Sequence, residues 1–223
     1  AYGTRRLQKS LRKEGIIVTR RKLGQIMKAN QLVSKYTHKK YRSKASDCNH
    51  SPIKNELNRE FKAGQNKTVL VTDLTYVKVK QRWHYLCVIV DIKNREIVGR
   101  SVGAHKTADL VLKAMSQIKL NLNSVDLFHS DRGKEFDNHL IEDCLNTFGI
   151  IRSLSHKGCP YDNAIAEATF KAIKTEFIGH VNFDSLEQLE VQFNHYVDWF
   201  NYIRLHSVLN YQSPIEYKNR IME

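Results

Sequence analysis

The order of apolar and polar residues predicts strands from about residue 69 onward. Between 69 and 79 the two kinds alternate, which is the period of a half-buried strand. Residues 83–91 are almost continuously apolar, as in a strand covered on both faces, and 97–102 form a third apolar run after a polar turn. Three strands with short connections predict an antiparallel meander.

Helices and strands alternate in the rest of the chain. The periodicity predicts helices at about 107–119 and 137–148, strands at about 125–129 and 150–154, and two long final helices at about 162–179 and 185–202. A meander followed by this alternation predicts an α/β fold, with a mixed five-stranded sheet flanked by helices. The last helix carries an apolar stripe that would serve as a subunit interface or as this domain's own outer layer: Phe193, Tyr196, Val197 and Phe200.

A small basic helical segment precedes this domain. Residues 2–13 read as a short helix that closes near Gly15, and Thr19 is a plausible N-cap for a second helix that runs to about Met27. The pair is similar to part of a helix-turn-helix, although a basic two-helix packing unit explains the pattern equally well. In the first case the helix start would lie along DNA through Arg20, Arg21 and Lys22. We therefore divide the chain into a helix-turn-helix-like segment (1–33), a linker without apolar periodicity (34–65) and the main domain (66–223).

The net charge of +13 belongs to the front of the chain. Residues 1–67 contain 18 Lys or Arg against 4 Asp or Glu, whereas residues 68–223 contain 18 against 19, so the two parts carry +14 and −1. A concentrated positive segment attracts polyanions, which makes DNA or RNA the expected partner. A solvated surface or an acidic protein partner is the alternative.

Cysteine usage and hydropathy point to a cytoplasmic protein. Cys48, Cys87, Cys144 and Cys159 show none of the spacings of a zinc site, so reduced thiols are expected. No apolar run approaches the ~20 residues that span a bilayer, and no signal-peptide pattern is present. Because the chain starts at Ala1 without a Met and enters directly into a helix, we expect a fragment or a processed piece.

Three acids stand in settings that suit a metal site. Asp73 shares its strand face with valines, where an unpaired carboxylate is costly, and Asp131 follows the end of a strand, with Gly133 permitting a tight turn. Glu167 lies on a helix at the edge of an apolar stripe, with Lys171 and Lys174 on its own stripe. Each position also has an ordinary explanation: a hydrogen-bonded strand Asp, an Asp that caps a turn, and a surface Glu–Lys pair.

If the three acids converge, they would hold two Mg²⁺ or Mn²⁺ ions. Carboxylate oxygens suit these ions, and a pair about 3.5–4 Å apart can clamp both oxygens of a phosphoryl displacement. The lysines would suit a phosphate backbone that passes the site. His129 would orient a ligand from behind, or it is a packing or surface histidine.

Several ordered motifs resemble one family. They are Val71-Thr-Asp-Leu-Thr-Tyr76, His129-Ser-Asp-Arg-Gly133, a run from Lys157-Gly158 through Asp162-Asn163-Ala164 and Glu167 to Lys174 and Glu176, and a tail from Asn201 to Glu216. Together they closely resemble the DDE transposases of bacterial insertion sequences, of the two-reading-frame (insertion-sequence-three) type. The resemblance covers about residues 66–218 and is weaker in the basic helices. Leu70 stands where many members have Trp, which affects local packing rather than the acids.

The resemblance implies a ribonuclease-H-like, integrase-like catalytic core with Asp73, Asp131 and Glu167 on the metals. It implies that Lys174, with Lys171, contacts the DNA end, and that the protein nicks the ends of an element and joins them through a 3′-hydroxyl. A homo-oligomer is expected because two ends must be held together. It further implies that an upstream segment or companion protein recognises the terminal repeats, and a nucleoid-associated bacterial protein is expected.

Two other functions are consistent with the same residues. One is a ribonuclease-H-like nuclease that hydrolyses DNA without joining it. The other is a DNA-binding regulator derived from a transposase whose site has decayed, although acids at all three positions argue against decay.

Overall fold

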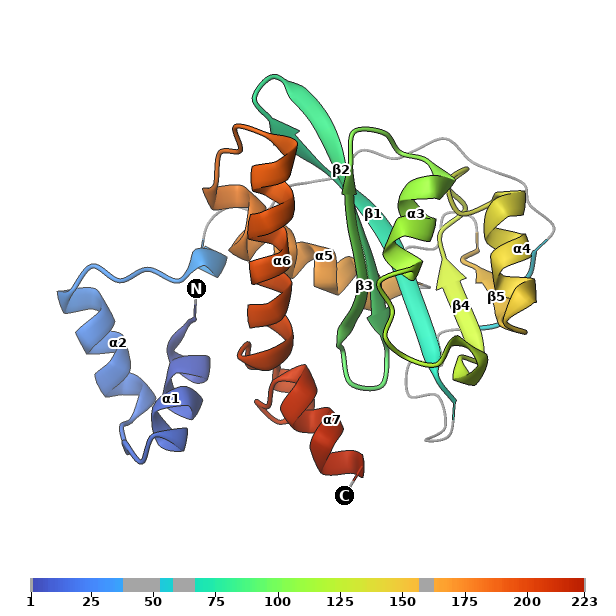
Figure 1. Cartoon of the computed structure of the whole chain (residues 1–223). Helices are drawn as coiled ribbons and strands as arrows, with labels where there is room; N and C mark the ends of the chain where they lie inside the picture. The colour runs from blue at the N-terminus through green and yellow to red at the C-terminus, as the bar shows by residue number, and fades with distance from the viewer. Residues whose placement is uncertain (1, 38–52, 58–66, 157–162, 223) are drawn as a thin grey trace.

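The computed structural model describes residues 2–37, 53–57, 67–156 and 163–222. Its centre is one five-stranded sheet in the order β3-β2-β1-β4-β5 (Figure 1). The first three strands form an antiparallel meander, whereas β4 runs parallel to β1 and β5 runs parallel to β4. The predicted mixed five-stranded sheet is confirmed, with these bounds: β1 Val69–Val79, β2 Arg82–Asp91, β3 Ile97–Gly103, β4 Leu127–Ser130 and β5 Ile151–Leu154.

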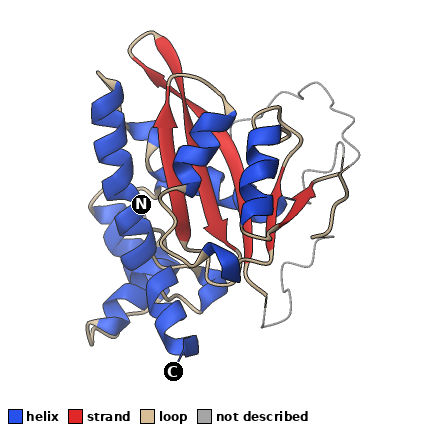
Figure 2. Ribbon diagram, turned by 45° about the vertical axis from the view of Figure 1, so that its right-hand side comes forward, coloured by secondary structure: helices blue, strands red, loops and turns tan. Residues whose placement is uncertain are grey.

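Helices cover both faces of the sheet (Figure 2). One apolar core lies between the sheet and helices α3 (Ala108–Met115) and α4 (His139–Thr147). The other lies between the sheet and helices α5 (Ala164–Glu176) and α6 (Leu186–Tyr202). Strand β1 serves both cores because its alternate residues point to opposite faces, with Leu70 in the first and Val71 in the second.

The apolar stripe of α6 belongs to this domain's own core. Phe193 and Val197 are completely buried, and Tyr196 and Phe200 lie beside them in the cluster that includes the β1 valines. Of the two alternatives for this stripe, the outer layer is therefore the one that the structure supports.

The N-terminal segment contains the two predicted helices, α1 (Thr4–Lys13) and α2 (Arg20–Ala29). Gly15 ends the first with a φ of +79°, a conformation that glycine adopts without strain. Thr19 caps the second, because its hydroxyl accepts the Lys22 N–H at 3.2 Å. The structure also contains a final helix that the sequence pattern did not predict, α7 (Pro214–Met222), and four short 3₁₀ helices: η1 (Lys35–Thr37), η2 (Leu122–Ser124), η4 (Ile178–His180) and η5 (Ser207–Leu209).

Some predictions fall outside the described residues. These include most of the linker and two of the four cysteines, Cys48 and Cys159. Cys87 and Cys144 are free thiols. Within the described part of the chain, no helix combines the length and the apolar character needed to cross a bilayer.

Candidate active site

Two of the three acids are carried by neighbouring parallel strands. Val71 of β1 pairs with His129 of β4, so two residues further along each chain bring Asp73 and Asp131 to the same level of the sheet. Strand β4 ends at Ser130, which places Asp131 at the carboxyl end of the strand. This is the edge where open α/β sheets place ligand sites.

Asp73 is the acid most affected by its surroundings. Its pKa is raised from 3.8 to about 8, chiefly by burial and then by the negative charge of Asp131, with a smaller contribution from Glu167; the Leu74 N–H and the Lys174 ammonium oppose this shift. The Leu74 N–H donates to Asp73 Oδ1 at 2.7 Å. A carboxyl group that titrates this high is protonated at neutral pH unless a cation replaces the proton.

The Asp131 carboxylate is held by its own turn. The Gly133 N–H donates to Asp131 Oδ1 at 2.9 Å, so this acid does cap a turn. A Cβ at Gly133 would lie 2.2 Å from Glu135 Oε1, so any larger residue there would displace the Glu135 side chain. The second oxygen of Asp131 takes no part in that bond, so the turn holds the carboxylate without excluding a cation.

Glu167 is positioned by the first turns of α5. Asn163, the residue before this helix, donates its side-chain N–H to the Thr72 carbonyl at 3.0 Å, which ties the helix start to β1 beside Asp73. The stripe of Ala166, Phe170 and Ile173 is buried as predicted, and Glu167 lies next to it on the exposed side. Partial burial raises the pKa of Glu167.

The two lysines of the Glu167 stripe differ in their contacts. Lys174 Nζ lies 5.7 Å from the centre of the Tyr76 ring, and its charge acts on Asp73. Lys171 is exposed. The Lys174 ammonium on α5 therefore lies close enough to act on the charge of Asp73.

A second charged pair next to the acids was missed by sequence reasoning. Lys106 Nζ lies 2.7 Å from Glu135 Oε1, and the Glu135 side chain is only 5% exposed. Burial would lower the pKa of Lys106. The negative charges of Glu135, Asp131 and Asp73 outweigh burial, so the pKa is raised. No local signal marks this pair, because the two residues lie 29 positions apart in irregular segments.

The donor types at this site fit divalent metal, although the three acids do not form one compact cluster. Among the residues that the structure describes, no three Asp, Glu, His or Cys side chains are close enough to hold one ion together. Asp131 and Glu167 each lie near enough to Asp73 to raise its pKa.

The remaining predicted site residues are His129 and three basic residues at the start of α2. His129 is completely buried, and its ring nitrogens lie 2.8 Å from the Ser153 hydroxyl and 3.0 Å from the Ser155 hydroxyl. These contacts join β4 to β5, which is the packing role that we considered beside a role in orienting a ligand. The basic residues predicted to lie along DNA are exposed at the start of α2, at the opposite end of the molecule from β4 in Figure 1: Arg20, Arg21 and Lys22.

Three protein families match parts of this chain. Residues 64–160 match the family described as "Integrase core domain", residues 167–222 match a second family of the same description, and residues 1–40 match the "HTH-like domain". The second and third matches cover α5 to α7 and the two N-terminal helices.

Curated relatives resemble the chain over nearly its whole length. It is 30% identical to the transposase for insertion sequence element IS904 of Lactococcus lactis, over 97% of this chain and 87% of the relative. It is 28% identical to transposase InsF for insertion sequence IS3A of Escherichia coli, over 98% of this chain and 77% of the relative.

Solved structures with the same fold are retroviral integrase cores. The catalytic core domain of HTLV-2 integrase in complex with magnesium matches with a TM-score of 0.51 at 17% identity, over 68% of this chain and 94% of that one. The catalytic core domain of BIV integrase matches with a TM-score of 0.51 at 20% identity, over 71% and 97%. At these identities the likeness establishes the ribonuclease-H-like fold.

Proposed function

Because this chain belongs to the insertion-sequence transposases with an integrase core domain, we propose that it nicks the ends of an insertion sequence and joins them by strand transfer. Asp73, Asp131 and Glu167 would be the catalytic acids. The observation that carries this proposal is geometric: Asp73 and Asp131 lie at the same level of neighbouring parallel strands, and Asn163 ties the start of the helix that carries Glu167 to β1 beside Asp73. Such clustering of like charges is costly unless cations neutralise it.

The three acids would hold two Mg²⁺ or Mn²⁺ ions, with Asp73 as their shared neighbour. Bound there, the ions would activate the attacking water or 3′-hydroxyl and stabilise the leaving oxygen. The Gly133 N–H keeps one oxygen of Asp131 fixed, and Asn163 fixes the start of the helix that carries Glu167. This pre-organisation matters because positioning and charge stabilisation dominate phosphoryl transfer.

The basic groups of the chain would place the DNA. Lys174, beside Asp73, would bind a phosphate next to the scissile bond, and Lys171 one turn earlier would bind the same strand further along. The exposed start of α2 would hold the duplex through Arg20, Arg21 and Lys22. Because two ends must meet, the active species would be a homo-oligomer on DNA in the bacterial cytoplasm.

Pre-cut duplex ends of the insertion sequence, incubated with Mg²⁺ and a target duplex, test the proposal. We expect joined product from the parent chain and a loss of at least 10³-fold in Asp131→Asn. Asp126→Asn is the matched control, because Asp126 is exposed at the opposite end of the same strand and accepts the Thr68 N–H at 2.7 Å. Hydrolysis without joined product would indicate a nuclease, and full activity in Asp131→Asn would remove this residue from the site.

A further inference from the structure

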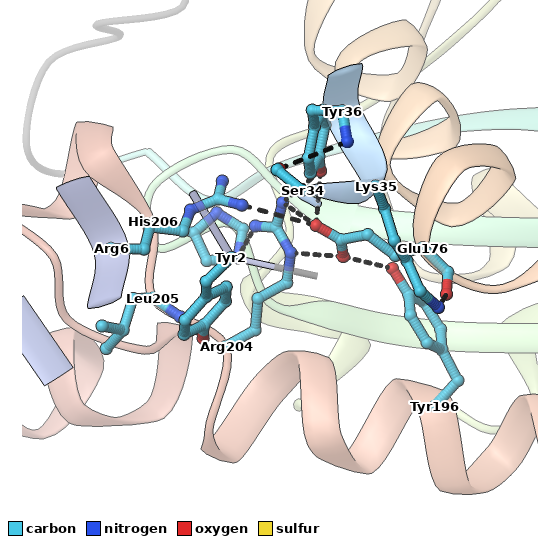
Figure 3. Close-up of polar contacts among 10 residues, drawn as sticks. All are labelled: Tyr2, Arg6, Ser34, Lys35, Tyr36, Glu176, Tyr196, Arg204, Leu205 and His206. Atoms are coloured by element: carbon cyan, nitrogen blue, oxygen red, sulfur yellow. Dashed lines mark hydrogen bonds and ion pairs between the residues drawn. The ribbon is translucent and has the colours of Figure 1, made fainter. Parts of the chain in front are cut away.

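The carboxylate of Glu176, the last residue of α5, is the meeting point of three parts of the chain (Figure 3). Its side chain is 1% exposed, so a lone negative charge there would be unfavourable. Donors surround it from the segment after α6, from α6 itself and from the N-terminal segment. We call this set the Glu176 joint: Glu176, Arg204, Tyr196, Tyr36, Arg6 and Lys35.

One half of the joint belongs to the catalytic domain. Arg204 binds Glu176 through two nitrogens, with Nε 2.7 Å from Oε2 and Nη2 2.9 Å from Oε1, and the Tyr196 hydroxyl donates to Oε2 at 3.0 Å. His206 Nε2 lies 2.9 Å from Arg204 Nη1 and accepts from it. Burial alone would raise the pKa of Glu176, but Arg204 and the two tyrosines outweigh it, so the pKa is lowered and the carboxylate stays ionised.

The other half comes from residues 2–36. The Tyr36 hydroxyl donates to Glu176 Oε1, Arg6 Nη1 lies 3.4 Å from the same oxygen, and Lys35 Nζ donates to the Glu176 carbonyl at 3.0 Å. The Arg6 guanidinium also lies 5.5 Å from the centre of the Tyr36 ring. The N-terminal segment thus reaches the end of α5 with a hydroxyl and two cations.

The N-terminal segment has other contacts with the rest of the chain: the Leu205 N–H donates to the Tyr2 hydroxyl at 2.8 Å, the Tyr2 and Trp199 ring centres lie 6.4 Å apart, and Lys9 Nζ lies 5.4 Å from the centre of the Tyr211 ring. None of the residues in α1 is buried, and Leu23 is the one buried residue in α2. The Lys13–Glu216 ion pair, at 2.7 Å, is nearly half exposed on both sides, and exposed pairs stabilise weakly. Among these attachments, the contacts of Glu176 join the N-terminal segment to a carboxylate that is buried in the rest of the chain.

We propose that the Glu176 joint fixes the helix-turn-helix-like helices to the same helix that carries Glu167, so that DNA bound by α2 reaches the acids at a set distance. Glu176 is then a positioning residue. It lies nine residues after Glu167, or about 14 Å along α5 at about 1.5 Å per residue. Because its oxygens are already occupied, it is not a further metal ligand. The part of this proposal that concerns DNA rests on the proposed function. The part that concerns the attachment of the N-terminal helices to α5 does not.

Two single-hydroxyl variants separate attachment from general stability. Tyr36→Phe removes a donor to Glu176 that comes from the N-terminal segment, and Tyr196→Phe removes a donor to the same carboxylate that comes from α6. We expect Tyr36→Phe to reduce hydrogen-exchange protection in α1 and α2 at least fivefold. Tyr196→Phe should leave that protection unchanged relative to the rest of the domain.

Nicking assays on the same proteins test the delivery of DNA. On a duplex long enough to reach α2, Tyr36→Phe should nick at least tenfold more slowly than the parent or cut at several neighbouring phosphates. On a short pre-cut end, its rate of joining to a target duplex should be unchanged. Unchanged protection and nicking in Tyr36→Phe, or an equal loss of protection in Tyr196→Phe, would overturn the proposal. A parent chain that nicks no DNA would refute the proposed function, and the exchange data would still decide the attachment.

Discussion

Replacing Asp73 by Asn should stabilise the metal-free protein while abolishing its activity. The folded-state pKa of this carboxyl is about 8 against an ordinary value of 3.8, chiefly because of burial and of the neighbouring Asp131. Folding therefore forces Asp73 either to take up a proton or to bear an unfavourable charge. Asn has nearly the same shape, carries no charge and keeps an oxygen for the Leu74 N–H.

The size and sign of this effect follow from proton linkage. A raised carboxyl pKa contributes stability that is fully present below pH 3.8 and is lost as the pH rises through about 8. At pH 7.5 the loss is about 5 kcal/mol, of which we expect about 2–4 kcal/mol to be recovered in Asp73→Asn. The advantage of the variant over the parent should therefore grow between pH 4 and pH 8.

Urea unfolding in EDTA at pH 5, 6.5 and 8 measures this advantage, with Asp126→Asn as the exposed control. Added Mg²⁺ should stabilise the parent and leave Asp73→Asn unchanged. Since binding must displace the Asp73 proton, the apparent metal affinity of the parent should fall about tenfold for each pH unit below 8. A variant no more stable than the parent at pH 8, or an advantage independent of pH, would refute this reasoning.

Three other predictions concern separate parts of the molecule. His206 is nearly buried and its pKa is lowered to about 2 by burial and by Arg204, so its stabilising effect is present above about pH 6.5 and is lost as the pH falls. Between pH 7 and pH 5 the protonation of His206 should lower the free energy of unfolding of the parent by about 2 kcal/mol, measured with urea. His206→Asn should lack this pH-dependent contribution, and the same dependence of unfolding free energy on pH in both proteins would contradict the prediction. Lys174→Gln should slow nicking at subsaturating DNA at least tenfold, whereas exposed Lys113→Gln should not, and equal rates would exclude a phosphate contact. Thr19→Ala should weaken the start of α2 by about 1 kcal/mol, seen as roughly fivefold faster exchange of nearby amides, and unchanged exchange would show that the cap is dispensable.

Periodic patterns predicted the elements that bury one face against the sheet. The alternation of β1 and the stripe of α5 were readable because side-chain period follows directly from strand and helix geometry. Helix α7 was missed because it is only nine residues long and polar on average. The sequence showed that α6 has an apolar stripe. It did not show whether this stripe packs inside the domain or against another subunit, because periodicity does not identify the surface that covers a helix.

The polar partners could not be predicted in the same way. Glu176 was quoted as part of a motif, yet its partner Tyr36 lies 140 residues away and no local pattern joins them. The ion pair of Lys106 with Glu135 was hidden for the same reason. The fold alone determines which polar side chains from distant parts of the sequence contact one another in the interior. The three acids could therefore be named from the sequence, whereas the polar partners of Glu176 and Glu135 could not.

The central claim is that Asp73, Asp131 and Glu167 together bind catalytic metal ions. Anomalous diffraction from crystals of the parent chain soaked in Mn²⁺ tests it most directly. The account predicts Mn²⁺ peaks bounded by Asp73 together with Asp131 or Glu167. Active protein whose Mn²⁺ peaks all lie elsewhere, with these three carboxylates bare, would contradict it.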